Sequence, residues 1–217
     1  MNYVDFVLTP IYIFLLYLFF RRKRKKYEDP LLQKYHRQGF WIKIFASILF
    51  ILYYSYLTEG DSTVLYQLEG NNLYHLILNN SDNLKYLFHK GKDFDLSLVK
   101  APDNQGYFRE EGNFMVIRLD AIFSFFSFGS YAVINLFFAC LAFSGLWKLY
   151  IFFYTQYPKL HKQFAISILY FPTVAFWSAG LLKDTLCIAA LGWLNCAMYG
   201  LFYNRKSVIK NSFILFI

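Results

Sequence analysis

The 217-residue chain has few of the residues that normally cover a soluble protein. Only 17% of its residues are charged, whereas 57% are hydrophobic and 23% are aromatic. A soluble domain of this composition would have too little polar surface to cover its apolar interior. The composition therefore excludes a disordered chain and argues against a soluble globular enzyme.

Motifs for metal binding and for common soluble catalysis are also missing from the sequence. The three cysteines, Cys140, Cys187 and Cys196, lie inside apolar segments and show no CxxC or Cys/His spacing. Neither a zinc site nor a disulfide framework is predicted from such a pattern. A Gly-rich phosphate loop, a GxSxG nucleophile elbow and an HExxH motif are absent as well. We therefore expect no cofactor and no metal ion.

Long apolar runs are what the chain has in abundance, and several approach the roughly 20 residues needed to cross a bilayer. The predicted fold is an all-α, polytopic transmembrane protein with one large extracytoplasmic loop, at 58–113, and an interfacial helix, at 114–127. The predicted spans are residues 3–20, 41–57, 129–154, 164–179 and 184–203. We treat 1–217 as a single membrane domain, with 27–40 as a short connector. A new apolar run at 211–217 predicts that this is the N-terminal part of a longer chain.

Charge sets the expected orientation of these spans. The formal net charge is +8, but the basic residues lie beside the apolar runs, where positive charge marks the cytoplasmic side. The basic run at 21–26 thus places the N-terminus outside the cell. Residues 58–113 hold nine of the fourteen acidic residues and five basic ones, as expected of an outer loop. We predict a multi-pass protein of the inner (plasma) membrane with the lipid bilayer, not nucleic acid, as partner.

The 114–127 stretch admits two interpretations. If it were a span, the basic group at 159–162 and the one at 205–210 would both fall outside. As an interfacial helix it keeps both groups inside, and we adopt this interpretation.

The first candidate catalytic feature is the octapeptide 59–66, directly after the second predicted span. Asp61 is our candidate general base, because a carboxylate at the membrane surface can accept a proton from a hydroxyl or amine. Glu59 either assists Asp61 or is a plain surface charge, and Tyr66 is a candidate substrate contact. The alternative for the whole octapeptide is that Asp61 is only a solvent-exposed acid beside a glycine in a turn.

A second candidate feature is the break between the last two predicted spans, at 177–184. A charged residue in the lipid-facing centre of a span is costly, so Lys183 and Asp184 are expected at a hairpin tip or polar cavity. Lys183 suits a lipid-linked phosphate, and Asp184 suits the start of a helix. Arg118, on the predicted interfacial helix, is a third candidate substrate contact. The alternative is that these charges only end a hairpin or meet lipid headgroups.

The order of these segments along the chain resembles that of a known protein family. The series consists of Gly60-Asp61-Ser62 with Tyr66, then NFMVIRL at 113–119, FGSY at 128–131 and FPTVAFWSAGLLKD at 171–184. It resembles bacterial membrane glycosyltransferases of the C-type superfamily (GT-C), which includes protein mannosyltransferase-like proteins. The likeness runs from residue 40 to residue 203, and the segment at 171–184 is its most specific part.

The resemblance implies a membrane glycosyltransferase with its active site at the extracytoplasmic face. Such proteins transfer a sugar from a polyprenyl-phosphate-linked donor to a glycan, lipid or protein acceptor. Their catalytic base is an acidic residue of the first large outer loop, a position that Asp61 matches. A polysaccharide polymerase and a non-catalytic membrane subunit of cell-surface glycan assembly are the alternative hypotheses.

Overall fold

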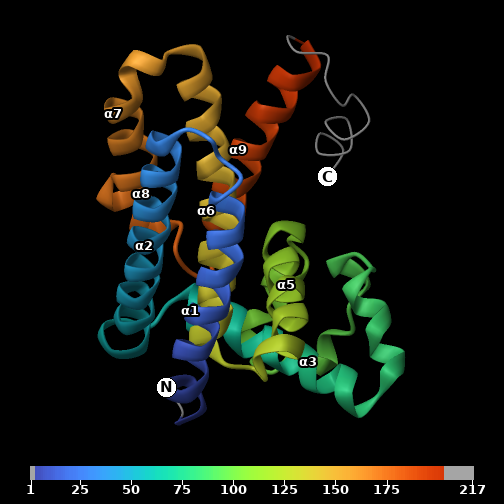
Figure 1. The fold of residues 1–217 in the computed structure, drawn as a ribbon. Coiled ribbons are helices and arrows are strands. Elements are labelled where there is room, and N and C mark those ends of the chain that lie inside the picture. Colours follow the sequence, from blue (N-terminus) through green and yellow to red (C-terminus); the bar gives the residue numbers. More distant parts are fainter. Residues whose placement is uncertain (1–2, 203–217) are drawn as a thin grey trace.

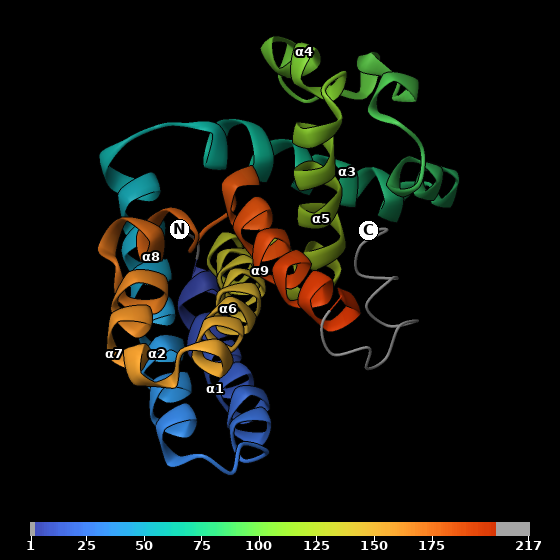
Figure 2. The ribbon, with the colours of Figure 1, turned by 90° about the horizontal axis from the view of Figure 1, so that it is seen from above.

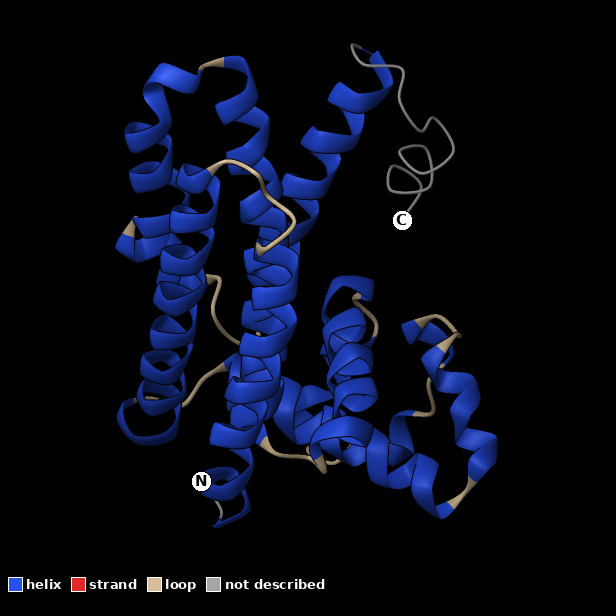
Figure 3. Cartoon of the chain, in the orientation of Figure 1, coloured by secondary structure: helices blue, strands red, loops and turns tan. Residues whose placement is uncertain are grey.

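The computed structural model describes residues 3–202, and the regular structure in that range is entirely helical (Figure 1, Figure 3). The predicted all-α class is confirmed. The longer helices are α1 (Tyr3–Arg24), α2 (Pro30–Leu52), α3 (Leu68–Asn79), α5 (Glu111–Ser127), α6 (Tyr131–Gln156) and α9 (Lys183–Phe202). Three short helices are α4 (Gln105–Phe108), α7 (His161–Phe164) and α8 (Pro172–Trp177).

Helix α6 lies at the centre of the main bundle and packs against α1, α2 and α9. Nearly every residue from 131 to 143 is buried. Its contact with α9 is backbone to backbone: a Cβ built on Gly145 would lie 2.3 Å from the Ala189 carbonyl oxygen. A Cβ on Gly192 would in turn lie 2.1 Å from the Gly145 carbonyl oxygen. Glycines therefore set the separation of these two helices, as small residues do in many membrane bundles.

The two ends of the bundle differ in charge. At one end the α1–α2 turn meets the end of α6 and the start of α7. There the Tyr154 hydroxyl donates to Asp29, and the Tyr35 hydroxyl lies 2.8 Å from His161 Nδ1. The basic groups at 21–26 and 159–162 share this end. At the other end lie residues 58–113, which hold nine of the fourteen acidic residues (Figure 1). There the Ser130 hydroxyl donates to Asp5 and joins the start of α1 to the turn between α5 and α6.

Two helical stretches of the described chain are long and apolar enough to cross a membrane, Pro30–Leu57 and Tyr131–Gln156. They contain or nearly coincide with the predicted spans 41–57 and 129–154. The other predicted spans stay predictions. The one at 164–179 is interrupted, because a π-helical segment, η8 (Ala165–Tyr170), ends before Pro172 and α8 ends at Trp177.

The expectation that 27–40 forms a connector was wrong from Pro30 onward. Asp29 caps α2 by accepting a hydrogen bond from the Leu31 N–H at 2.8 Å, and Pro30 occupies the first turn. An acidic cap followed by proline is a strong helix start, because proline lacks the N–H that the first turn leaves unpaired.

The acid-rich segment, residues 58–113, folds together with α5 as a small layer beside the bundle, in which α5 crosses α3 (Figure 2). Its 81–104 region is a series of short 3-10 turns. Glu69 organises them: its buried carboxylate accepts hydrogen bonds from the N–H groups of Lys100 and Ala101, both at 2.9 Å, and from Asn104 Nδ2 at 3.0 Å. The predicted interfacial helix is present as a helix, beginning at Glu111 rather than at 114.

Candidate active site

Asp61 begins a π-helical segment, η2 (Asp61–Gln67), just after α2 has continued as η1 (Tyr53–Leu57). The turn between them brings Gly60 against an aromatic ring, since a Cβ there would lie 2.9 Å from Tyr54 Cε1. The space beside Gly60 is therefore filled by the Tyr54 ring. The Asp61 side chain is exposed in the first turn of η2.

Two buried hydroxyl contacts fix the segment that carries Asp61. Ser62 Oγ lies 2.8 Å from the Tyr131 hydroxyl at the start of α6. One turn later, the Tyr66 hydroxyl donates to Asn113 Oδ1 on α5, also at 2.8 Å. Tyr66, the candidate substrate contact, is only 1% exposed, and its hydroxyl is bonded to α5 below the surface.

Lys183 and Asp184 form the first turn of α9, and both are exposed. The break that precedes them is rigidly held. Ala179 and Leu181 are fully buried, and the Leu181 N–H donates to Asn135 Oδ1 on α6 at 2.8 Å. The N-terminal end of a helix generally leaves N–H groups unpaired and has a partial positive charge, which favours an anion beside Lys183.

A chain of polar contacts joins the Asp61 segment to the start of α9. Tyr66 donates to Asn113, Asn113 Nδ2 donates to Glu110 Oε2 at 2.7 Å, and Glu110 Oε1 pairs with Lys183 Nζ at 3.7 Å. Three elements that are far apart in sequence, η2, the start of α5 and the start of α9, thereby meet at one place.

The charges at this place are mostly negative. Burial raises the pKa of the Tyr66 hydroxyl well above its usual value, and the carboxylates of Asp61, Glu110 and Asp184 raise it further. Tyr66 therefore stays protonated and remains a hydrogen-bond donor at neutral pH. These three carboxylates therefore act on one hydroxyl, and Lys183 pairs with one of them, Glu110. Such a set can accept protons at its carboxylates and offers one cation to an anion.

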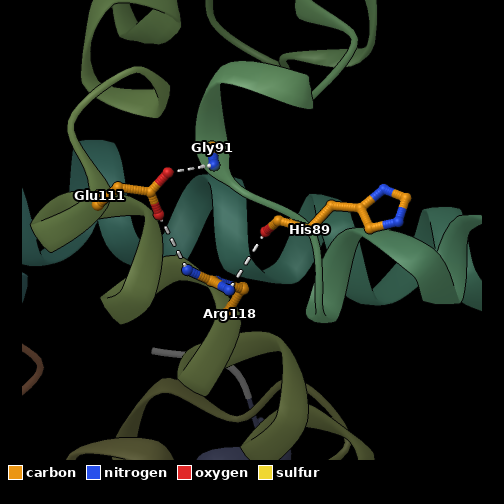
Figure 4. A network of polar contacts seen from close by, with 4 residues as sticks. All are labelled: His89, Gly91, Glu111 and Arg118. Carbon is orange, nitrogen blue, oxygen red and sulfur yellow. Dashed lines mark hydrogen bonds and ion pairs between the residues drawn. The ribbon is translucent and has the colours of Figure 1, made fainter.

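Arg118 is not brought to this region but ties α5 to the turn at 89–91 (Figure 4). Its guanidinium pairs with Glu111 at 3.3 Å and donates to the His89 carbonyl oxygen at 3.3 Å. Glu111 in turn accepts the Gly91 N–H at 2.8 Å. The guanidinium also lies 4.7 Å from the centre of the Phe114 ring.

Glu59 lies two residues before Asp61 and is exposed. Within the described residues its carboxylate makes no hydrogen bond or ion pair, so nothing in the structure ties it to Asp61.

Sequence reasoning missed several residues that build this site. Asn113 and Asn135 are buried amides whose partners become visible only in three dimensions. Lys43 had a signal, because a lone lysine inside an apolar run needs a polar partner. It is 2% exposed, and its ammonium donates to the Ala175 carbonyl oxygen at 3.1 Å and to Ser178 Oγ at 2.5 Å, which holds the end of α8.

Comparison with known proteins adds no relative. No family model, curated protein or solved structure matches the chain. Residues 3–202 also contain no group of three or more His, Cys, Asp or Glu side chains placed to hold a metal ion. The case for a function therefore rests on the geometry described above and on the motif order.

Proposed function

We propose that the chain is the membrane-embedded part of a C-type glycosyltransferase. It transfers a sugar from a polyprenyl-phosphate donor to a glycan, lipid or protein acceptor at the extracytoplasmic face. The observation that carries the proposal is the contact chain from Tyr66 through Asn113 and Glu110 to Lys183. This contact chain links the segment that carries Asp61, an exposed acid, to Lys183, an exposed cation at the start of α9.

The proposed reaction assigns one role to each of these charges. Asp61 accepts the proton of the acceptor hydroxyl as the acceptor oxygen attacks the anomeric carbon. The new glycosidic bond forms while the bond from that carbon to the phosphate oxygen breaks, and the polyprenyl phosphate leaves with the electron pair. Lys183 and the N-terminal end of α9 stabilise the charge that develops on the leaving phosphate.

The loose ion pair of Lys183 suits this role. Both partners are exposed, with side chains 50% and 60% accessible, and their charged atoms are 3.7 Å apart. Exposed pairs of this kind contribute little to stability, so a phosphate can replace Glu110 as the partner of Lys183 at small cost. Asp184 remains available to accept hydrogen bonds from sugar or acceptor hydroxyls, whereas Arg118 keeps α5 in position.

The proposal includes placement in a membrane, which rests on the exposed apolar side chains and on the distribution of basic residues. Large apolar side chains are exposed on the outer faces of α1 and α2, among them Phe14 at 59% and Phe45 at 62%. Exposed apolar side chains along two neighbouring helices suit contact with lipid. The positive-inside rule then directs the basic end to the cytoplasm and the Asp61 end outward. We infer a multi-pass protein of the plasma membrane with an extracytoplasmic N-terminus.

The proposal is tested by following donor consumption in proteoliposomes that contain the chain. Undecaprenyl phosphates carrying radiolabelled mannose, galactose or arabinose serve as separate donors. With the donor that is consumed, Asp61→Asn is expected to lower the rate by about 10²–10⁴-fold, because the general base is lost. Asp82→Asn, which changes another exposed acid of the same segment, is the matched control and should retain the wild-type rate.

The test also addresses the non-catalytic alternative. Lys183→Ala should slow donor consumption, and Lys183→Arg should restore part of the rate by restoring the positive charge. If the chain consumes none of the donors, and Asp61→Asn and Lys183→Ala both leave cell-surface glycan unchanged, the transferase proposal fails and a non-catalytic subunit takes its place.

A further inference from the structure

An open pocket of about 320 Å³ lies between the first half of α2 and the end of η8. Its lining residues are Arg37, Gln38, Trp41, Ile42 and Tyr170. Helix α2 starts at the basic end of the bundle and leads towards the segment that carries Asp61 (Figure 1). The pocket therefore lies towards the basic end and is separate from the proposed active site.

The packing of η8 on α2 builds one wall of this pocket. Gly39 of α2 lies against Leu169, because a Cβ on Gly39 would lie 3.5 Å from Leu169 Cδ1. Leu169 is buried, and Tyr170 follows it as the last residue of η8. The Tyr170 hydroxyl donates to Gln38 Oε1 at 3.0 Å. An apolar contact and a hydrogen bond thus hold Tyr170 beside Gln38.

The polar end of the pocket offers hydrogen-bond donors without an acid to receive them. Within residues 3–202 the Arg37 guanidinium makes no hydrogen bond or ion pair, and Gln38 Nε2 makes no hydrogen bond. The sequence contains no Asp or Glu at 30–58 or at 121–183, so neither element that forms the pocket supplies a counter-ion. A guanidinium and an amide N–H that lack partners favour an anion such as a phosphate.

The exposed face of α2 changes from polar to apolar within the pocket. At 34–38 its exposed residues are Lys34, Arg37 and Gln38. At 41–52 its exposed residues are Trp41, Phe45, Leu49 and Leu52. These positions recur every three or four residues and so follow one side of the helix. A tryptophan at such a change of polarity is typical of the membrane interface. The ligand therefore needs an anionic part beside Arg37 and an apolar part along Trp41.

Charge and hydrogen bonding narrow the choice of headgroup. One cation, Arg37, lines the pocket, and it balances the single negative charge of a phosphodiester. An ethanolamine headgroup would add an ammonium that finds no acid here. The hydroxyls of a glycerol headgroup can accept from Gln38 Nε2 and can donate to the Tyr170 oxygen, whose own proton is used on Gln38. A glycerol headgroup thus fits better than an ethanolamine headgroup.

We propose that this pocket binds one molecule of an anionic phospholipid, with phosphatidylglycerol as the favoured lipid. Arg37 pairs with the phosphate, Gln38 and Tyr170 bind the headgroup hydroxyls, and an acyl chain lies along Trp41 and Phe45. The bound lipid connects η8 to α2 at the basic end of the bundle. This inference rests on the membrane placement proposed above but not on sugar transfer, and its test measures lipid binding.

The test titrates the purified full chain in detergent with lipid and follows binding by native mass spectrometry. Palmitoyl-oleoyl phosphatidylglycerol and palmitoyl-oleoyl phosphatidylethanolamine, which share their acyl chains, are compared. The first phosphatidylglycerol should bind about 10-fold more tightly, because the ethanolamine ammonium competes with Arg37 for the phosphate. Arg37→Gln should remove this preference, and Arg37→Lys should keep part of it. Lys159→Gln removes an exposed cation of the same end outside the pocket and should keep the preference in full.

A photoreactive lipid locates the site in the wild-type chain and so does not depend on the folding of a variant. Phosphatidylglycerol with a diazirine in one acyl chain is cross-linked to the chain in phosphatidylcholine liposomes. The labelled peptide should contain residues 41–45. Unlabelled phosphatidylglycerol should compete with the label, whereas glycerol 3-phosphate, the headgroup chemistry without acyl chains, should not.

Several outcomes would overturn the lipid site. Equal binding of the two lipids does so, as does a loss in Lys159→Gln as large as that in Arg37→Gln, which would show general attraction to the basic end. Labelling confined to other parts of the chain refutes the location, and competition by glycerol 3-phosphate assigns the pocket to a soluble phosphate ester. A chain that consumes no sugar donor but prefers phosphatidylglycerol would refute the transferase and support the lipid site.

Discussion

Acidic side chains in this chain behave differently according to what surrounds them. Glu69 is buried but receives several N–H donors, so its charge is satisfied inside the layer. Asp61 is exposed and thus available to a substrate. Asp29 is an intermediate case, because it accepts hydrogen bonds from the Tyr154 hydroxyl and from the Leu31 N–H. The role of each acid follows from its donors and not from its residue type.

The contacts of Asp29 make the stability of the basic end dependent on pH. The Tyr154 hydroxyl, followed by the Leu31 N–H, lowers the pKa of Asp29 below its usual value. A lowered folded-state pKa means that the stabilisation is present above the unfolded-state pKa and is lost as the pH falls through the folded one. Asp29→Ala should therefore cost about 1 kcal/mol at neutral pH through loss of the α2 cap.

The unfolding midpoints of the wild type and of Asp29→Ala are measured at a series of acidic pH values. The difference between them should shrink below a pH of about 4, where the carboxyl of the wild type becomes protonated. Glu28→Gln, at the exposed neighbouring position, is the control and should change little at any pH. If the difference in unfolding midpoint between wild type and Asp29→Ala did not change with pH, the charge of Asp29 would make no contribution to stability.

At the scale of elements, the sequence was most informative where local chemistry decides the structure. The helix break before Lys183 follows from Gly180 and the charged pair, and the start of α2 was available from Asp29 and Pro30 although we assigned it to a connector. The contact chain through Asn113 and Glu110 could not be predicted from the sequence, because it depends on how α5 packs on η2. The partners of Arg118 are a backbone carbonyl and a neighbouring acid, which motif order does not reveal.

The packing of α6 on α9 gives a prediction at the same scale. Gly145→Ala places a methyl group 2.3 Å from the Ala189 carbonyl oxygen, and backbone atoms cannot move aside as a flexible side chain can. We expect a loss of about 1–3 kcal/mol, measured as a lower unfolding midpoint of the purified protein. Gly106→Ala is the control, because a Cβ on Gly106 meets nothing within 4 Å. Equal midpoints for the two variants would contradict the observed helix contact.

At the scale of the whole molecule, the distribution of charge separates two ends of one helical bundle. The acid-rich segment and the start of α9 share one end, and the basic groups at 21–26 and 159–162 share the other. A soluble bundle has no need for such a separation, whereas a membrane protein uses it to orient its helices. The proposed site requires that Lys183 and Asp61 both reach the extracytoplasmic side.

Cysteine accessibility in intact spheroplasts tests this arrangement. In a background in which the free cysteines Cys140, Cys187 and Cys196 are replaced, single substitutions are made at exposed positions of each end. A membrane-impermeant maleimide should label Tyr107→Cys and Lys183→Cys in intact spheroplasts, but Lys159→Cys only after lysis. Labelling of Lys159→Cys alone before lysis would reverse the orientation and place Asp61 in the cytoplasm. Equal labelling of all three before lysis would mean that the bundle does not span the membrane, and the proposed use of a lipid-linked donor at the outer face would then fail with it.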